Sequence, residues 1–397
     1  MKYLLIRNCR IPNYNPQELF SVLIGGNKIL QIDKNIMHPA IDTREYDAQG
    51  NVLIPSLVDV ASDFGEASTE DDLTKTAIAD VEAGITSWIT PMTPSSIDKN
   101  TTILEHKSDR FLNYGYHLSL NNITRKIDAV RSKLVVLPRG ISSIYFRVTT
   151  PATREAIENV GFILNCAADL ETTVVIELVR EGSANEHVST LLKLAGEIEV
   201  DPRNRVYFLN VRYEEELDIL RRMQNVCIVG AELRYSPLHS DVETLKEFTA
   251  ERYCDILRSH SWCSASIVRE RMSYFGITNQ NNDFLHKNQL SIIYGLPVPK
   301  PFTAEELIEF TTMRASKMLG LWPNYGRVEV GADADLIVWN DRWEETAKLQ
   351  EDTGQTIGLP LRGKIDCVVM NGNVVYDADG VIANNIDGRY IYRRLLF

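Results

Sequence analysis

The sequence predicts an α/β protein: a (β/α)8 barrel of the TIM type with a small β-sandwich domain formed by both chain ends. Three observations point there. The 397 residues exceed one small domain and suffice for a barrel plus a smaller domain. Short apolar runs alternate with helical patterns through the middle of the chain. Near both ends, apolar runs are joined by turn residues without helical patterns between them.

The two chain ends are predicted to pair into one sandwich, residues 1–51 with residues 326–397, beside a barrel of residues 52–325. The first fifty residues hold too few strands to be stable alone, so they need strands from elsewhere. Gly25-Gly26-Asn27 and Asn371-Gly372 have the composition of hairpin turns. The expected strands are 3–6, 20–24, 28–32, 327–330, 336–339, 367–370 and 374–376.

The barrel is predicted from strand candidates with helical patterns between most of them. The segment from Ser68 places Leu73, Ala77 and Val81 four residues apart, on one helix face. Pro151 is expected at the first position of another helix. A third helix is expected over 213–223, and Thr303 begins a capping box before a fourth. The expected strands are 52–59, 85–89, 115–120, 141–147, 173–178, 206–210, 226–231 and 274–278.

Composition narrows the class of protein. The net charge of −12 argues against a nucleic-acid or anionic-membrane surface, and no stretch approaches the length of a membrane span. The six cysteines are scattered without a C-x-x-C pair, as expected of reduced core cysteines. The first residues hold too short an apolar run for a signal peptide. We therefore expect a cytoplasmic protein.

The stretch 51–66, NVLIPSLVDVASDFGE, begins as an apolar strand and becomes polar at Asp59. A barrel needs such a strand at its carboxyl mouth, where barrel enzymes carry their active sites. The stretch resembles the first barrel strand of the cyclic amidohydrolases (dihydroorotase, dihydropyrimidinase, hydantoinase and allantoinase). In that family the segment runs roughly V-x-P-G-x-x-D-x-H-x-H-F-R-E. The residues that keep its frame are Pro55, Asp59, Phe64 and Glu66.

The C-terminal part extends the resemblance. Residues 314–320, RASKMLG, resemble the family's N-P-A-K-x-x-G-L, and residues 325–339 resemble its K-G-x-I-x-x-G-x-D-A-D-L-V run. Residues 358–364 and 369–376 resemble the tail of the dihydroorotase and dihydropyrimidinase branch. The similarity covers essentially the whole chain. It implies the barrel-plus-sandwich fold and, by analogy, a homo-oligomer.

Ring-amide hydrolysis in this family uses hydroxide bridged between two divalent metals. The resemblance implies two histidine ligands after strand one, a carboxylated lysine on strand four, a histidine each on strands five and six, and an aspartate on strand eight. This chain departs from that set at every position. The residues found there are Ala61 and Asp63 on strand one, Tyr145 on strand four, Ile176 or Glu177 on strand five, Asn210 on strand six and Asn279 on strand eight.

The positions that contact substrate in the family have changed as well. Gly65 replaces the arginine of H-F-R-E, and Met92 replaces an asparagine after strand two. Arg147, at the end of strand four, and Arg258, in a remnant of the family's P-P-L-R, are the other candidates to line a ligand pocket; Glu232 is retained. None of the seven histidines forms an H-x-H pair. We therefore predict no catalytic residue, no metal and no cofactor at the strand ends.

Three hypotheses remain open. The first is a catalytically inactive dihydroorotase-like protein of pyrimidine biosynthesis; the resemblance implies a precedent in homologues that hold aspartate carbamoyltransferase in an active assembly. The second is a live hydrolase of a cyclic amide that uses a divalent metal such as zinc, or a hard cation bound by Asp63, Glu177, Asn210 and Asn279. The third is a small-molecule sensor in which Arg147 and Arg212 bind a carboxylate or phosphate in the emptied pocket.

Overall fold

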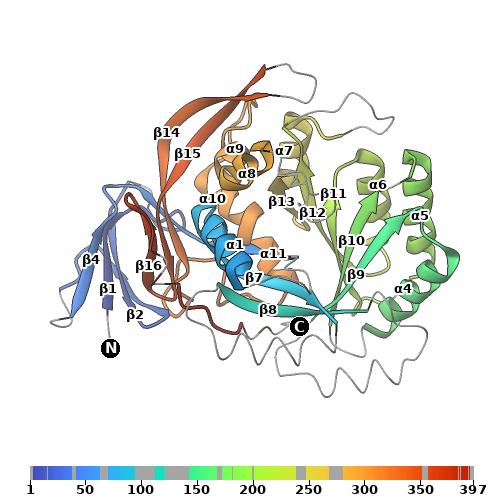
Figure 1. Ribbon diagram of the computed structural model, residues 1–397, viewed down its shortest axis with the longest axis horizontal. Coiled ribbons are helices and arrows are strands. Elements are labelled where there is room, and N and C mark those ends of the chain that lie inside the picture. Colours follow the sequence, from blue (N-terminus) through green and yellow to red (C-terminus); the bar gives the residue numbers. More distant parts are fainter. Residues whose placement is uncertain are drawn as a thin grey trace.

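The computed structural model describes residues 3–15, 17–37, 42–62, 70–93, 112–120, 143–167, 172–180, 182–198, 201–237, 247–267, 280–350, 356–382, 384, 386–391 and 393. Figure 1 shows a β-rich part, built from both chain ends, beside a curved parallel sheet with helices on its outer side. Among the described residues, no helix is both long enough and apolar enough to cross a membrane.

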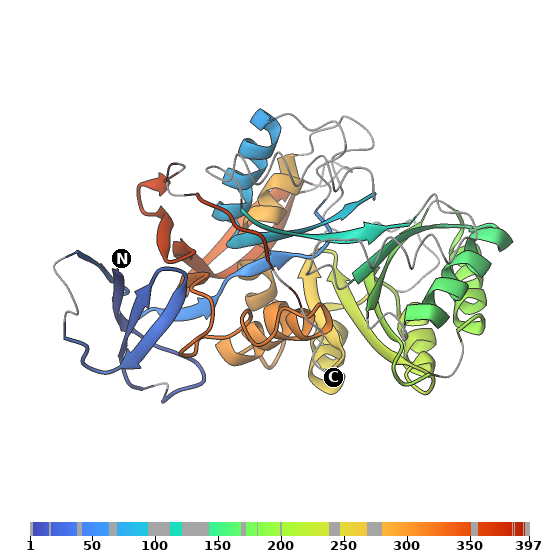
Figure 2. The ribbon, with the colours of Figure 1, turned by 90° about the horizontal axis from the view of Figure 1, so that it is seen from below.

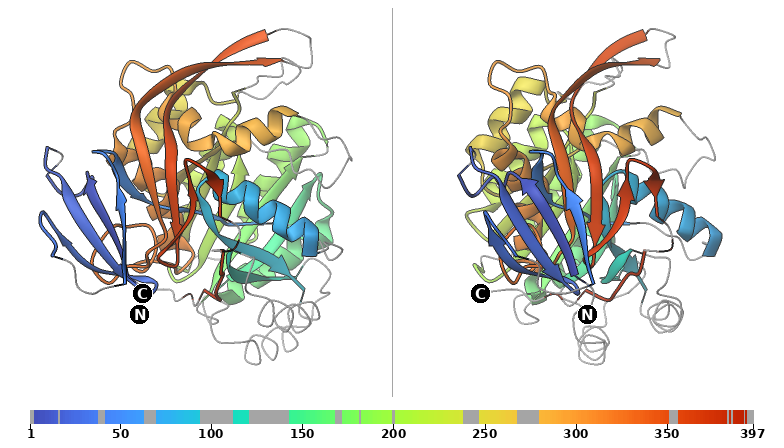
Figure 3. Two further views of the ribbon diagram at one scale, coloured as in Figure 1. Left: turned by 60° about the vertical axis from the view of Figure 1, so that its left-hand side comes forward. Right: turned by 90° about the vertical axis from the view of Figure 1, so that its left-hand side faces the viewer.

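Two antiparallel-rich sheets pack face to face in the β-rich part. One has the strand order β3-β2-β1-β4 and the other β17-β16-β15-β14-β5. Apolar side chains from both sheets form a shared core that includes Ile6, Val22, Leu336 and Val369. Figure 3 shows the blue N-terminal strands lying against the red C-terminal ones. The strands are β1 (Tyr3–Cys9), β2 (Phe20–Gly25), β3 (Lys28–Asp33), β4 (Thr43–Asp47), β5 (Val52–Pro55), β14 (Leu336–Gln350), β15 (Thr356–Met370), β16 (Asn373–Asp377) and β17 (Gly380–Val381).

Eight parallel strands form the barrel sheet in the order of the sequence, from β6 to β13. Both edge strands line one cavity of about 40 Å³, β6 with Val58 and Asp59 and β13 with Ser264 and Ser266, so the sheet curls back on itself. Figure 2 shows this curvature from below. The strands are β6 (Leu57–Asp59), β7 (Ile85–Met92), β8 (Asn113–Ser119), β9 (Ser143–Thr150), β10 (Thr173–Arg180), β11 (Arg205–Val211), β12 (Ile228–Tyr235) and β13 (Cys263–Ile267).

Helices follow most of the described barrel strands. Capping boxes begin α5 at Ser183 and, as predicted, α10 at Thr303, where side chains satisfy backbone N–H groups that have no partner within the helix. The segments are α1 (Glu70–Glu82), α4 (Arg154–Ala167), α5 (Ala184–Gly196), α6 (Glu214–Met223), α7 (Ala250–Ser259), α8 (Gln280–Lys287), α9 (Gln289–Tyr294), α10 (Ala304–Ile308), the π-helical η2 (Glu309–Met313) and α11 (Arg314–Met318).

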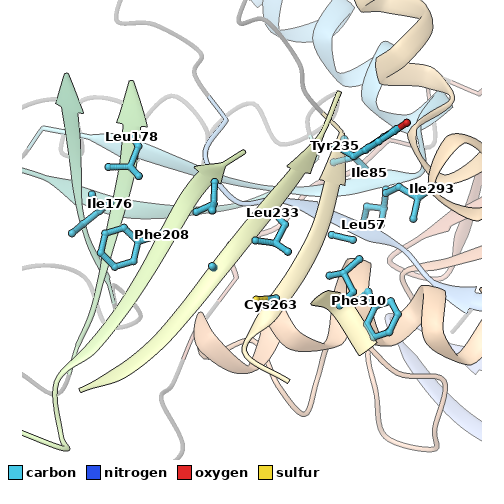
Figure 4. Packing of buried hydrophobic residues seen from close by; sticks show 14 of the residues in the cluster. Leu57, Ile85, Ile176, Leu178, Phe208, Leu233, Tyr235, Cys263, Ile293 and Phe310 are labelled. Carbon is cyan, nitrogen blue, oxygen red and sulfur yellow. The ribbon is translucent and has the colours of Figure 1, made fainter. Parts of the chain in front are cut away.

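Alternate residues of each barrel strand face opposite sides, as the two-residue period of a strand requires. Ile176 and Phe208 pack outward with helix residues such as Leu217. Figure 4 shows Ile176, Leu178 and Phe208 together on this face. Val175 and Tyr207 point the other way and belong to a separate cluster that fills the barrel interior. The interior is therefore a packed core rather than an open channel.

The segment predicted as one strand over 52–59 is two strands. Val52–Pro55 pairs with β14 of the five-stranded sheet, and Leu57–Asp59 pairs with β7 of the barrel. The chain changes sheets at Ser56, whose hydroxyl hydrogen-bonds that of Thr86, 2.7 Å away. The domain boundaries at 51/52 and 325/326 stay predictions.

Two further expectations need correction, and a third falls outside the described residues. No strand forms at 327–330, because Gly326 and Gly331 turn the backbone there with φ values of 85° and 89°. Pro151 precedes α4 instead of beginning it, since Thr150 is still paired with Arg180 in the sheet. The eighth barrel strand is Cys263–Ile267; the range 274–278, where we expected it, lies outside the described residues.

Candidate functional site

The carboxyl ends of β9 and β10 bring three predicted residues together. In the parallel register Tyr145 lies opposite Val175, and Arg147 lies opposite Glu177. The Tyr145 hydroxyl donates a hydrogen bond to Glu177 Oε2, and Arg147 Nε donates to the same oxygen over 3.3 Å. Glu177 is only 3% exposed. The strand-five carboxylate is thus held by a phenol and a guanidinium from strand four.

Strand five decides between the two residues that the sequence left open. Ile176 lies in the outward-facing core with Phe208, whereas Glu177 bonds to inward-facing Tyr145. A shift of one residue along a strand moves a side chain to the other face of the sheet. Of the two, Glu177 occupies the barrel mouth.

Strand six ends in a β-bulge that sets its polar residues. The pairing of β11 with β12 shifts between Phe208 and Val211, and Asn210 adopts a left-handed φ of 68°. The Asn210 amide donates from Nδ2 to the Leu178 carbonyl over 2.8 Å and accepts at Oδ1 from Arg212 Nε over 2.7 Å. Both polar ends of Asn210 are therefore engaged within the protein.

Glu216, on α6, fixes the chain just after this bulge. Its Oε2 accepts hydrogen bonds from the backbone N–H groups of Arg212, at 2.7 Å, and Tyr213, at 3.0 Å. Its Oε1 is paired with His187 Nε2, and His187 Nδ1 lies 2.8 Å from Thr150 Oγ1. Thr150, His187 and Glu216 are all at most 2% exposed. Because they are buried, these three side chains position the strand end and are not accessible to a substrate.

Strand one contributes Asp59 and Ala61 to the described part of the site. Asp59 Oδ1 accepts a hydrogen bond from the backbone N–H of Ala61 over 3.2 Å, and Ala61 is buried in the barrel interior. The small apolar side chain of Ala61 offers no ligand atom. Asp63 and Asn279, the other two predicted site residues, lie outside the described residues.

The candidate pocket residues separate in space. Met92 ends β7 and is buried, and Arg147 belongs to the strand-end group above. Arg258 is on α7, where it bonds to Glu306 and to the carbonyls of Lys300 and Pro301. These contacts hold Arg258 against the start of α10, so it joins two outer segments.

One ion pair at the mouth was missed by the sequence analysis. Arg234 Nε donates to Glu232 Oε1 over 2.7 Å, and both residues of β12 are buried. The sequence spacing could have predicted this ion pair, because two charged residues that are two positions apart in an apolar strand lie on the same face. In the sequence AELRY, Glu232 and Arg234 lie between apolar residues that pack outward.

The strand-end donors that the structure describes do not fit the two-metal centre that the resemblance implies. The Tyr145 hydroxyl donates a hydrogen bond to Glu177. Arg147 places a permanent positive charge beside the same carboxylate. Asn210 already uses its amide oxygen. Within the described ranges, no three His, Cys, Asp or Glu side chains gather as metal ligands would.

His117 is the one described histidine on a barrel strand, β8, and it is fully buried. Its Nε2 donates to the Val60 carbonyl over 2.7 Å, and its Nδ1 lies 2.6 Å from Ser143 Oγ. Arg393 donates to the same hydroxyl over 2.8 Å. Burial, with the positive charge of Arg393, lowers the pKa of His117 to about 3. His117 is therefore a neutral link between strands.

His117 predicts a pH dependence of stability. Between about pH 6.5 and pH 3 the unfolded chain binds a proton that the folded chain refuses, so the free energy of unfolding falls as pH falls. The slope from this group approaches about 1.4 kcal/mol per pH unit. His117→Asn should flatten the curve by that amount in urea titrations across the window. Parallel curves for the two proteins would show that His117 titrates normally.

Comparison with known proteins supports this architecture. The amidohydrolase family model matches residues 282–375. The chain is 28% identical to D-hydantoinase of Ralstonia pickettii over 94 residues, and 32% identical to dihydroorotase of Clostridioides difficile over 118 residues. These stretches cover 22% and 29% of this chain, and 21% and 24% of the two relatives, so they span about a quarter or less of either relative.

Solved structures extend the likeness to the whole fold. D-hydantoinase from Bacillus sp. AR9 superposes with a TM-score of 0.76 at 16% identity, covering 99% of this chain and 100% of that one. The fold prediction, a barrel with a sandwich of the chain ends, is confirmed. Residues 282–375 of this chain match the amidohydrolase family model, and the chain resembles dihydroorotase, hydantoinase and dihydropyrimidinase members of that family.

Proposed function

We propose that this protein is a catalytically inactive member of the amidohydrolase family. The observation that supports this most is the Tyr145–Glu177–Arg147 cluster, in which a buried strand-five carboxylate is bound by two strand-four donors. Ring-amide hydrolysis requires an activated water held where charge develops. In this chain the corresponding side chains are bonded to one another, so the strand ends stabilise the barrel.

A direct assay separates this proposal from the hydrolase alternative. Purified protein incubated with zinc, manganese or magnesium should hydrolyse dihydroorotate, dihydrouracil and hydantoin no faster than buffer containing the same metal. Glu177→Gln should give the same background. Turnover that exceeds the buffer rate and is lost in Glu177→Gln would overturn the proposal and indicate a rewired site.

The biological role proposed with inactivity is that of a structural partner. The resemblance implies aspartate carbamoyltransferase as that partner, in pyrimidine biosynthesis in the cytoplasm, with this chain as a homo-oligomer. Light scattering during size-exclusion chromatography of this protein, alone and mixed with the transferase of the same organism, tests both points. A monomer that elutes independently of the transferase would contradict this role without bearing on inactivity.

A further inference from the structure

Two arginines lie side by side where β11 and β12 end. The last residues paired between these strands are Val211 and Leu233, in parallel register, and the next residues along are Arg212 and Arg234. Arg234 shares its strand face with Glu232, which lines the barrel cavity. The pair therefore lies at the carboxyl mouth, the edge where barrel proteins bind their ligands.

The donors of the two guanidinium groups are only partly used. Arg234 Nε bonds to Glu232, and Arg212 Nε bonds to the neutral amide oxygen of Asn210 over 2.7 Å. Within the described part of the chain, the terminal Nη groups of Arg212 and Arg234 donate no hydrogen bond. Among the described residues, the terminal NH₂ groups of these two adjacent guanidinium groups therefore remain available to bind a ligand.

Arg212 is a buried cation that lies beside a second cation, Arg234, whose Nε is paired with Glu232. Burial lowers the pKa of Arg212, and the neighbouring charge of Arg234 lowers it further. Glu216 and Glu247 act on this pKa in the opposite direction, and the two oxygens of Glu216 are already bound to His187 and to backbone N–H groups. Like charges on adjacent strands repel, and a partly buried cation is stabilised by an anion that it can bind directly.

We propose that Arg212 and Arg234 form a binding site for an oxyanion, the carboxylate or phosphate group of a small molecule. A guanidinium presents parallel N–H donors that match two oxygens of either group. One anion between the two guanidinium groups would satisfy the donors and relieve the repulsion. The proposal does not depend on catalytic inactivity.

The surroundings hold Arg212 in place before any ligand arrives. Asn210, anchored to the Leu178 carbonyl, fixes its Nε, and Glu216 fixes its backbone N–H. Glu216 is itself bonded to buried His187. Because Arg212 is held at its Nε and at its backbone N–H, it loses little conformational freedom when a ligand binds, and this favours affinity.

Thermal melting of the full-length protein tests the site, with inorganic phosphate and succinate as probes against sodium chloride at equal ionic strength. The wild type should melt higher in at least one probe, because a ligand of the folded state stabilises it. A larger response to phosphate identifies a phosphate site, and a larger response to succinate a carboxylate site. Arg212→Gln should weaken the apparent affinity about tenfold or more.

Two further variants sharpen the result. Arg221→Gln removes one positive charge from the exposed face of α6, where Arg221 pairs with Asp218, and should leave the response unchanged. Arg212→Lys keeps the positive charge but loses the paired guanidinium donors. Its melting temperature should therefore respond only weakly to phosphate or succinate. In chloride, Arg212→Gln should melt at or above the wild type, since it removes the repulsion.

Three results would overturn the proposal. The first is no response of the wild type to either probe. The second is an equal response of the wild type and Arg212→Gln, which would place the anion elsewhere. The third is a failure of both Arg212 variants to fold, which would make Arg212 a structural residue.

Discussion

Gly372→Ala should lower the free energy of unfolding by about 2–5 kcal/mol. Gly372 lies in the turn between β15 and β16 with a φ of 76°, and a Cβ there would be 2.0 Å from the Gly26 carbonyl oxygen. Gly26 lies in the turn between β2 and β3, so the two hairpins touch where the two sheets meet. Neither backbone can retreat without disturbing its sheet. Guanidinium titration followed by circular dichroism measures the loss.

Gly331→Ala is the matched control. Gly331 has a similar φ of 89°, but nothing lies within 4 Å of an added Cβ. The free energy of unfolding of this variant should fall only by the cost of an alanine with a left-handed backbone, about 1–2 kcal/mol. Equal losses for the two variants would mean that the hairpins do not approach as closely as the structure has them.

Glu216→Ala should lower the free energy of unfolding by about 3–5 kcal/mol, as expected when one partner of a buried pair is removed. The variant deprives His187 and the backbone N–H groups of Arg212 and Tyr213 of their common acceptor. Because this carboxylate also holds Arg212 in place, the variant should lose the response to phosphate or succinate. Chemical denaturation and thermal melting measure the two effects.

Glu186→Ala provides the comparison, since Glu186 closes the capping box of α5 with Ser183 on an exposed surface. Its removal should cost about 1 kcal/mol. If the two variants lose the same stability, the buried His187–Glu216 pair contributes no more than an ordinary helix cap.

Much of the fold follows from local patterns. Seven barrel strands overlap their predicted ranges, and the turns at Gly26 and Gly372 follow from their composition. The sequence did not predict the eighth strand, β13, because its inward-facing residues Ser264 and Ser266 are polar. Only a short apolar pattern is left in CSASI. The long hairpin of β14 and β15 extends well past the predicted strands into polar sequence. There the strands are defined by their backbone pairing, and no apolar pattern in the sequence predicts them.

The site was harder to predict than the fold. The sequence identified Tyr145, Glu177 and Arg147 as separate positions, but their contacts depend on the register between two strands. Register also decided between Ile176 and Glu177, because one residue changes the face. The bulge at Asn210, which places Arg212 beside Arg234, depends on a left-handed φ that no pattern in the strand announces.

Elemental analysis tests most directly whether the strand ends hold internal hydrogen bonds in place of a metal pair. Protein expressed in zinc-supplemented medium and purified without chelator should carry well under one equivalent of zinc, manganese, iron, cobalt or nickel per chain. Glu177→Gln, purified alongside, should show the same content. One or two equivalents in the wild type, lost in Glu177→Gln, would contradict the account and establish a metal site at the barrel mouth.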